Sequence, residues 1–400
     1  MEIISSIYNS GHNIKKFYLG SQELKLAFLG NQVIYDEVVG DNDLNYIFYE
    51  FYKSDTLSNT VEAPFKSAIL KGQTLVNLVG EDKKRNILAD GKDIRVLTEF
   101  SGSKEYTVYF KVEQINNNGL IRLQYFNGLT FISGENKNIV VGVNTITFTT
   151  PANTTNIRFQ NANGVTELII DDLMILEGNY TNVDITYFVG MQSVKMPVLT
   201  TTNGEPEFIE VDGEQVPNEA FKSNILTVNE DVELRGIGNV KDELNILTGE
   251  LTQRVGEIVL DGSESWEYHL QTNTDTIAYR TPVRGTSPYS PILCDRFINV
   301  FNDSDTEHCF IGTSSIAIFI NRSRLSTVNT TGFKEYLQAN PLTIQYRLAN
   351  ESIKTVDLTM VDQDEQTISK LNSFNGTTHV STEVAENSIY PTIAIEVATE

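Results

Sequence analysis

The 400-residue sequence contains few of the residues that mark disulfide-bonded, metal-binding or helical proteins. It has two cysteines, one tryptophan and four histidines. Two cysteines build no disulfide framework. Cys294 and Cys309 either form a single bridge or remain two free buried thiols, and we expect the thiols. Alanine and long runs of Leu, Glu and Lys are scarce, whereas Thr, Asn, Phe and Tyr are abundant. This composition favours strands and turns over helices.

Basic residues are outnumbered by acidic ones, 30 to 53, which gives a formal net charge of −23. A surface this acidic repels nucleic-acid phosphates and anionic lipids, so both are poor partners. No stretch approaches the roughly 18 apolar residues of a membrane span. Residues 1–4 lack the basic start and apolar core of a signal peptide. We expect a soluble protein that is made in a cytosol and is not inserted into a membrane.

The motifs of common enzyme classes are missing: GxSxG, HExxH, the P-loop and GxGxxG. His308, Cys309 and Cys294 offer three soft ligands, but their spacing matches no zinc template. The stretch 302–307 is dense in oxygen donors and is either a calcium site or an exposed polar loop. Carboxylates are too plentiful for any pair to indicate a glycosidase. We expect no catalytic residue, metal or cofactor, with a structural calcium as the open alternative.

Alternation of apolar and polar residues predicts strands along most of the chain. In residues 120–125, Ile121, Leu123 and Tyr125 share one face of a strand, whereas Arg122 and Gln124 share the other. Similar patterns, separated by Gly, Asn and Pro, recur at residues 106–112, 144–150, 156–159, 168–176, 255–260, 316–320, 342–348 and 353–358. One helix is expected at 331–337 and a C-terminal strand pair at 378–384 and 392–397. The predicted fold is all-β, with tandem antiparallel β-sandwiches of the jelly-roll, carbohydrate-binding-module-like kind.

The first 40 residues repeat a short pattern at an interval of ten. Tyr18-Leu19-Gly20 is followed by Phe28-Leu29-Gly30, and each copy leads into an apolar stretch. Gly supplies a tight turn, and two such small β units cannot bury a core by themselves. We interpret residues 1–44 as an N-terminal β attachment element. The alternative is that they pack on the first sandwich of the same chain.

A longer repeat indicates the domain organisation. The sequence PFKSAIL at 64–70 returns as AFKSNIL at 220–226, each before a β-rich block of similar size. Unless the match is a coincidence, it predicts two related modules. The stretch 195–217 has no apolar periodicity and is expected to be a linker or an extended hairpin. The predicted parts are an attachment element at 1–44, a first sandwich with its lead-in at 45–190, a linker or extended segment at 191–233, and a second sandwich with C-terminal strands at 234–400.

Sugar recognition requires an aromatic ring beside planar hydrogen-bonding groups, and three stretches offer this combination. Trp266 and Tyr268 share one face by the period of two, although Trp266 suits a core better than a platform. Tyr289 lies between two prolines in an expected loop, and Arg158 and Gln160 lie near a strand end. The candidate ligand-binding residues are Trp266, Tyr268, His269, Tyr289, Arg158, Asn161 and Asn163.

Residues 234–266 resemble a signature of tail-fibre and minor structural proteins of phages that infect Gram-positive bacteria. The matching residues are Leu234, Arg235, Asn239, Asp242, Glu243, Gln253, Arg254, Val255, Gly256, Asp261, Gly262, Ser263, Glu264 and Trp266. The segments 341–358 and 372–397 resemble that family's closing strands. Residues 171–196 resemble the end of a carbohydrate-binding-like β-sandwich common in the same proteins.

The resemblance implies a non-enzymatic virion protein of the tail fibre or baseplate, synthesised in the host's cytoplasm and located in the phage tail. It implies receptor binding and host adhesion through cell-wall polysaccharide or teichoic acid. It also implies association with other tail or baseplate proteins and with further copies of the chain, as a homotrimer. The alternatives are a structural adaptor that binds no glycan and a glycan depolymerase. A collagen-like or coiled-coil stalk is not evident, so a fibre, a tip and a baseplate component all stay open.

Overall fold

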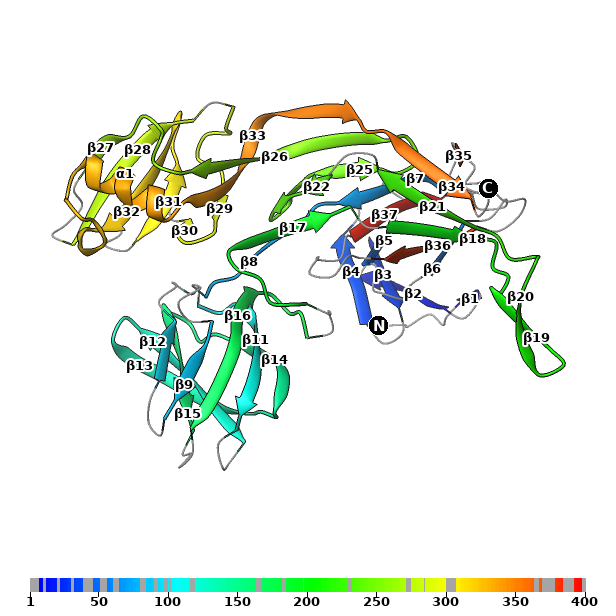
Figure 1. Ribbon diagram of the computed structural model, residues 1–400, viewed down its shortest axis with the longest axis horizontal. Coiled ribbons are helices and arrows are strands. Elements are labelled where there is room, and N and C mark those ends of the chain that lie inside the picture. The colour runs from blue at the N-terminus through cyan, green and yellow to red at the C-terminus, as the bar shows by residue number, and fades with distance from the viewer. Residues whose placement is uncertain are drawn as a thin grey trace.

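The computed structural model describes most of the chain between residues 65 and 362 (Figure 1). The gaps inside this range are 80–83, 90–92, 97–99, 101, 116–118, 163–166, 182–184, 197, 229–231, 271–274, 284 and 300–306. Before residue 65 and after residue 362 the structure describes only strands, and for most of these only the backbone. Within the described residues, no helix is long and apolar enough to cross a membrane.

The described chain is nearly all β, which confirms the expected fold class of sandwich-type domains. The predicted helix is present as α1 (Thr330–Ala339). Most of the strands expected from alternation are present as β11 (Glu105–Gln114), β12 (Leu120–Asn127), β14 (Gly142–Thr149), β15 (Asn156–Asn161), β16 (Leu168–Glu177), β26 (Glu250–Leu260), β32 (Ser315–Asn321) and β33 (Leu342–Thr355). Residues 353–358 are divided between the end of β33 and the start of β34 (Leu358–Asp362).

Two sheets pack face to face to form a central body. One has the order β29-β33-β26-β25-β7-β37-β5 and the other has the order β35-β34-β21-β18-β36-β6. Leu70 and Leu244 from the first sheet and Leu199 and Leu226 from the second lie in one buried core. The remaining bounds are β5 (Tyr46–Glu50), β6 (Thr56–Asn59), β7 (Phe65–Lys71), β18 (Val198–Thr202), β21 (Ser223–Val228), β25 (Glu243–Asn245), β29 (Ile292–Cys294), β35 (Thr367–Ile368), β36 (Thr378–Glu383) and β37 (Thr392–Val397).

The first lobe is a β-sandwich inserted between β8 (Thr74–Val76) and β17 (Met191–Lys195). Its sheets have the orders β10-β15-β12-β13 and β14-β11-β16-β9, and a large apolar core lies between them. The remaining strands are β9 (Asn86–Leu88), β10 (Asp93–Val96) and β13 (Thr130–Asn138). β8 and β17 pair with each other and, with β22 (Glu233–Leu234), form a three-stranded sheet. The lobe therefore begins and ends on hydrogen-bonded neighbours.

The second lobe is inserted between β26 and β33, two long paired strands that reach it from the central body (Figure 1). It contains a five-stranded sheet of order β27-β28-β32-β31-β30, and residues of α1 are part of its core. α1 begins where the Asn329 side chain accepts a hydrogen bond from the Gly332 N–H at 2.9 Å, a standard N-cap. The strands are β27 (Glu267–Leu270), β28 (Thr276–Pro282), β30 (Ile298–Asn299) and β31 (His308–Ile311).

The structure divides the chain differently from the predicted domains. Residues 191–233, expected to be a linker or an extended segment, supply β17, β18 and β21, and Val194 and Leu199 lie in the central core. Three consecutive threonines, 200–202, hid this role, because Thr201 is fully buried and accepts a hydrogen bond from Asn224 Nδ2 at 3.4 Å. An extended hairpin is nevertheless present, formed by β19 (Phe208–Val211) and β20 (Glu214–Pro217).

The longer repeat marks two strands of one sandwich. The copy at 64–70 leads into β7 and the copy at 220–226 leads into β21, one strand in each sheet of the central body. Leu70 and Leu226 are both buried in the same core. From β7 the chain continues through β8 to the first lobe, and from β21 it continues through β22 to β26 to the second lobe.

The C-terminal strands are where alternation predicts them, but they do not pair with each other. β36 pairs with β18 and β6, whereas β37 pairs with β7 and β5 in the other sheet. The prediction of a strand pair is therefore wrong. The chain crosses from one sheet of the central body to the other between these two strands, so each strand finds partners far away in the sequence.

The ten-residue repeat is a strand repeat. Four antiparallel strands form a meander near the N-terminus: β1 (Ile7–Asn9), β2 (His12–Leu19), β3 (Gln22–Leu29) and β4 (Gln32–Val38). The two aromatic-Leu pairs end β2 and β3. The glycines that follow lie outside the described residues. The role of this sheet as an attachment element stays a prediction.

Candidate functional site

One face of the first lobe combines half-buried planar polar groups with aromatic rings, of which Phe131 is 49% exposed. It is the outer face of the sheet β10-β15-β12-β13, and we call it the polar-aromatic face. Its members are Arg122, Gln124, Phe126, Phe131, Arg158 and Gln160. The face follows from the strand period, because Ile121, Leu123 and Tyr125 alternate with them and are 1%, 0% and 3% exposed. The predicted division of residues 120–125 into an apolar and a polar face is confirmed.

Arg158 is the centre of the polar-aromatic face. Its guanidinium carbon lies 4.0 Å from the centroid of the Phe126 ring, a cation–π contact. Phe131 meets the same ring edge-on, with centroids 5.6 Å apart, and is itself 49% exposed. An Arg158 Nη1 donates to Asp93 at 3.4 Å, whereas its Nε has no hydrogen-bond partner. The arrangement presents a fixed planar donor beside an accessible ring.

Two glutamines extend the polar surface across neighbouring strands. Gln124 and Gln160 come from β12 and β15, and the Nε2 of Gln124 donates to the Oε1 of Gln160 at 3.1 Å. On the next strand, Gly134 leaves room for Arg122 and Gln124, since a Cβ there would lie 2.9 Å from the Leu123 carbonyl oxygen, 3.3 Å from Arg122 Nε and 3.6 Å from Gln124 Cγ. The missing side chain lets both long side chains lie beside β13, where they are half-buried.

The charge of the polar-aromatic face is opposite to that of the chain as a whole. Arg122 and Arg158 lie on it, Arg122 makes no ion pair with a described residue, and Asp93 is the acidic neighbour of Arg158. Beneath the face, the Tyr125 hydroxyl donates to Glu135 at 2.5 Å. Burial would raise the pKa of Glu135, but the hydrogen bonds from Lys137 and Tyr125 outweigh it and lower that pKa. Glu135 is thus held as an anion on the inner side of β13, away from the two arginines.

Trp266 is part of the second lobe's core. It is 6% exposed and its ring meets Phe333 of α1 edge-on at 4.8 Å. Its Nε1 donates to Glu264 Oε2 at 2.8 Å, and the same carboxylate accepts from the N–H groups of Asp261 and Gly262 at 3.0 Å. The segment 261–266 is thus a turn that fixes the Trp266 side chain. This corrects the platform interpretation, because a ring covered by Phe333 offers no face to a sugar.

The other candidates of the second lobe lie at its surface. Tyr268 is on β27 and 52% exposed, and His269 follows it on the same strand, half-buried. Tyr289 is 60% exposed, has a φ of 53° and hydrogen-bonds Thr313 Oγ1 through its hydroxyl at 2.8 Å. Trp266 and Tyr268 were expected to share a face, but β27 begins at Glu267. A binding role for these surface residues stays a prediction.

The two asparagine candidates differ from Arg158. Asn161 is 2% exposed, and its Nδ2 donates to the Leu88 carbonyl at 3.0 Å, so this side chain joins the end of β15 to β9. Its side chain faces the interior, where no glycan reaches it. Asn163 lies outside the described residues. Sequence reasoning did not assign Phe126 and Phe131 to a site, although Arg122 and Gln124 on the same strand indicated a polar outer face.

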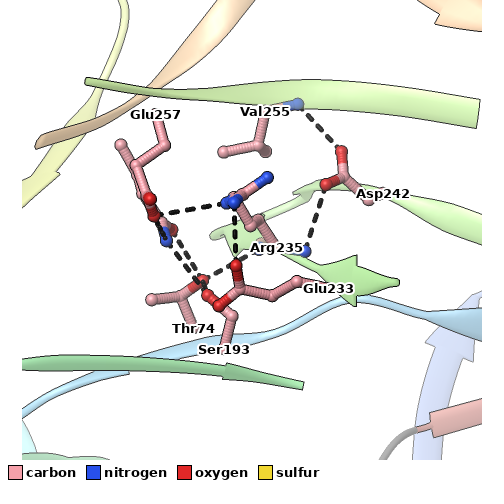
Figure 2. Close-up of polar contacts among 9 residues, drawn as sticks. Thr74, Ser193, Glu233, Arg235, Asp242, Val255 and Glu257 are labelled. Carbon is pink, nitrogen blue, oxygen red and sulfur yellow. Dashed lines mark hydrogen bonds and ion pairs between the residues drawn. The ribbon is translucent and has the colours of Figure 1, made fainter. Parts of the chain in front are cut away.

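A second polar cluster lies where both lobes join the central body (Figure 2). We call it the junction cluster; it contains Thr74, Ser193, Glu233, Arg235, Asp242, Glu257 and Gln345. Gln345 on β33 is 1% exposed. It accepts from Thr74 on β8 at 2.7 Å and donates to Ser193 on β17 and Glu257 on β26, each at 3.0 Å. One amide therefore connects the four strands that carry the two lobes.

Asp242 completes the junction by satisfying three main-chain donors. It accepts from the N–H groups of Arg235 at 3.1 Å, Arg254 at 2.7 Å and Val255 at 2.9 Å, the last two at an irregularity in the pairing of β26 with β33. Burial raises the pKa of Asp242, and the three donors only partly offset that rise. Figure 2 shows Arg235 between Glu233 and Glu257, with which it pairs at 2.7 and 3.3 Å.

Among the described residues, no three His, Cys, Asp or Glu side chains form a group that could hold a metal ion. The proposed calcium loop, 302–307, lies outside them except for Glu307, whose oxygens accept from the Asn321 N–H at 2.9 Å and from Arg324 at 2.8 Å. Cys294 and Cys309 are free buried thiols, as expected. In comparisons with known proteins, no family model matches the chain, and no curated protein or solved structure is significantly similar to it.

Proposed function

We propose that this protein binds bacterial cell-wall glycan through the polar-aromatic face of its first lobe, as a non-enzymatic component of a phage tail. The observation that carries the proposal is the group formed by Arg158 on Phe126, with Phe131 and the paired Gln124 and Gln160 beside it. An exposed ring can cover the C–H face of a sugar, while guanidinium and amide groups read its hydroxyls.

Two features support a glycan that carries negative charge, such as teichoic acid or an acidic wall polysaccharide. Arg122 and Arg158 lie on the face of a chain whose net charge is −23, so the positive charge is local. Arginine is also suited to planar recognition of phosphate and carboxylate groups. Neutral wall polysaccharide is expected to bind more weakly and with less dependence on salt.

The place in a virion is supported by the sequence. Residues 234–266 resemble tail-fibre and minor structural proteins, and their signature residues Arg235, Asp242 and Arg254 take part in the contacts of the junction. The strand orders of the first lobe, β9-β16-β11-β14 and β10-β15-β12-β13, support its interpretation as an eight-stranded jelly roll. A homotrimer would present three such faces, and linked weak sites raise avidity by about 10²–10⁴-fold.

Titration calorimetry with purified wall teichoic acid and wall polysaccharide tests the proposal. The variant Phe131→Ala removes an exposed ring and is expected to weaken binding at least about tenfold with little loss of stability. Its matched control is Val143→Ala, which removes an exposed apolar side chain, 55% exposed, from the other sheet of the same lobe. Binding should be unchanged in the control.

Three results would contradict the proposal or part of it. Equal binding by wild type and Phe131→Ala would remove the face from the site. Absence of binding to any wall polymer would favour the structural adaptor. Release of new reducing ends from the polymer would identify a depolymerase. Mass measurement in solution tests the homotrimer separately. If the protein is a monomer, the polar-aromatic face can still bind glycan, but the gain in avidity from three linked sites is lost.

A further inference from the structure

The hairpin β19-β20 extends from the central body without packing against it. In Figure 1 it projects beyond β18 and β21, the strands that it connects. Phe208, Ile209 and Val211 are 50%, 39% and 46% exposed, and every other residue of the two strands except half-buried Val216 is exposed. A two-stranded hairpin is at best marginally stable in water by itself. The described structure supplies nothing that covers its apolar side chains.

The turn and the base of the hairpin nevertheless have a defined geometry. Asp212 and Gly213 have φ values of 53° and 85°, as a two-residue type I′ turn requires. At its base, Asn218 Nδ2 donates to the Pro206 carbonyl at 2.8 Å and Asn203 Nδ2 donates to the Ala220 carbonyl at 2.8 Å. These bonds fix the direction in which the hairpin leaves β18 and β21. The chain thus holds an uncovered two-stranded sheet in a defined position.

The two edges of the hairpin differ. The Asn218 N–H donates to the Glu207 carbonyl at 2.9 Å, so the alternation of an antiparallel ladder turns the main-chain N–H and C=O of Phe208 and Glu210 outward. On the opposite edge the corresponding positions are Gln215 and Pro217, and proline has no N–H to offer. β19 therefore presents the edge that can accept a further strand.

One side of the hairpin carries an apolar group beside Glu214, the cross-strand partner of Val211, and its surroundings are acidic. Ile209 and Val216 are direct cross-strand partners and Val211 lies on the same side, two residues along β19. The segment from 205 to 219 has no basic residue, and its carboxylates are those of Glu205, Glu207, Glu210, Asp212, Glu214 and Glu219. A second copy of this edge would bring like charges together, which costs free energy. A basic strand would meet complementary charge.

We propose that the β19 edge is a docking site for an extended strand of another protein in which basic and apolar residues alternate. The strand would add to β19 by main-chain hydrogen bonds to Phe208 and Glu210. Its apolar residues would cover Ile209 and Val211, and its basic residues would face Glu210 and Phe208 on the other side. This site is independent of the polar-aromatic face and does not depend on the proposed glycan binding.

The test uses the full-length protein and a fluorescein-labelled synthetic peptide of nine residues in which Lys and Val alternate. The expected result is saturable binding that weakens as salt is raised from 50 to 500 mM. The matching peptide of alternating Glu and Val should not bind. Hydrogen exchange of the Phe208 and Glu210 amides should slow at least about tenfold in the complex, because these N–H groups become hydrogen-bonded. A general attraction to an acidic protein would not protect them.

Three substitutions test whether the β19 edge itself binds the peptide. Glu210→Pro removes an outward N–H without breaking a bond of the hairpin and is expected to weaken peptide binding at least about tenfold. Gln215→Pro makes the same change on the β20 edge and should leave binding within about twofold. Glu210→Gln keeps the N–H, removes one charge and should have an intermediate effect. Circular dichroism checks that all three fold.

Each contrary result overturns the proposal. These results are no binding of the Lys-Val peptide, equal binding by Glu210→Pro and wild type, and binding without protection of Phe208 and Glu210. If sedimentation shows an oligomer that Glu210→Pro disperses, the occupant of the edge is a second copy of this chain.

Discussion

Both lobes bury aromatic rings in their cores, but they differ in how the rings near their candidate binding residues are placed. In the first lobe, Phe126 and Phe131 lie on the outer face of a sheet beneath and beside Arg158. In the second, Phe333 of α1 stacks on Tyr279 at 4.3 Å with an interplanar angle of 11° and meets Trp266 edge-on. The first lobe closes its core with a second sheet, whereas the second lobe uses a helix, and its large rings fill the space between helix and sheet.

This difference shows that the environment of a ring, more than its presence in the sequence, decides whether it can bind a ligand. Trp266 is the single tryptophan and attracts attention for that reason, yet its ring is covered. Phe131 occupies an unremarkable stretch and remains half-exposed at the edge of a cation–π pair. Three substitutions test this contrast, and a fourth tests the junction that both lobes share.

Trp266→Ala should have the largest effect. Removing a buried ring that contacts Phe333 is expected to lower the free energy of unfolding by about 3–5 kcal/mol. Glycan binding by the folded fraction should be unchanged. Urea unfolding and titration calorimetry on the same preparation check both parts. A variant of wild-type stability with lost glycan binding would return Trp266 to the site and end the contrast between the lobes.

Asp242→Asn tests the junction that both lobes share. Asn keeps one acceptor for Arg254 and Val255 but turns an amide donor toward the Arg235 N–H, so stability should fall by about 1–3 kcal/mol. The folded pKa of Asp242 is raised, so its contribution is greatest below the unfolded value of about 4 and is lost as the pH rises through the folded value. The wild type's advantage over Asp242→Asn should therefore shrink from pH 3.5 to pH 7 in urea unfolding. An advantage that grows with pH would contradict the raised pKa.

Arg158→Lys is a smaller change on the polar-aromatic face. An ammonium cannot lie flat on the Phe126 ring as a guanidinium does, so about 0.5–1 kcal/mol of stability should be lost. The affinity of the folded protein for teichoic acid should also fall, because the planar guanidinium donor is gone. Thermal unfolding and calorimetry measure the two effects. Binding equal to wild type would mean that Arg158 serves only the fold.

Tyr268→Ala should have the smallest effect. The side chain is 52% exposed on β27, and substitutions at such positions usually change stability by no more than about 0.5 kcal/mol. Glycan binding should also be unchanged if the first lobe carries the site. A clear loss of binding, with stability preserved, would show that the second lobe has a site of its own around Tyr268.

Local patterns in the sequence predict the elements well. Alternation in residues 120–125 predicts both the strand and its two faces, because successive side chains of a strand point to opposite sides and only one side is buried. The helix expected at 331–337 lies within α1, whose first turn is capped by Asn329. The Asp212-Gly213 turn is also a local feature, because Asp followed by Gly is a preferred pair for the two positive φ values of a type I′ turn.

Long-range pairing is beyond such patterns. β37 pairs with β7 and β5, more than three hundred residues earlier in the chain, and no local signal specifies that partner. Thr201 is buried although its neighbours suggest a polar linker. The exposure of Phe131 and the burial of Trp266 depend on what packs over each ring, and Phe333 covers Trp266 from 67 positions away in the sequence. Of the polar-aromatic face, the sequence indicated the polar residues Arg122, Gln124 and Arg158 but not its aromatic rings.

Because β8 pairs with β17 and β26 pairs with β33, the chain enters and leaves each lobe on two neighbouring, hydrogen-bonded strands. A short turn joining Val76 to Met191 would close a hairpin and leave the central sheets intact. Recombination at those two positions would exchange one lobe for another with little disturbance of the central sheets. Each lobe can therefore change in sequence and size while the strands of the central body keep their pairing.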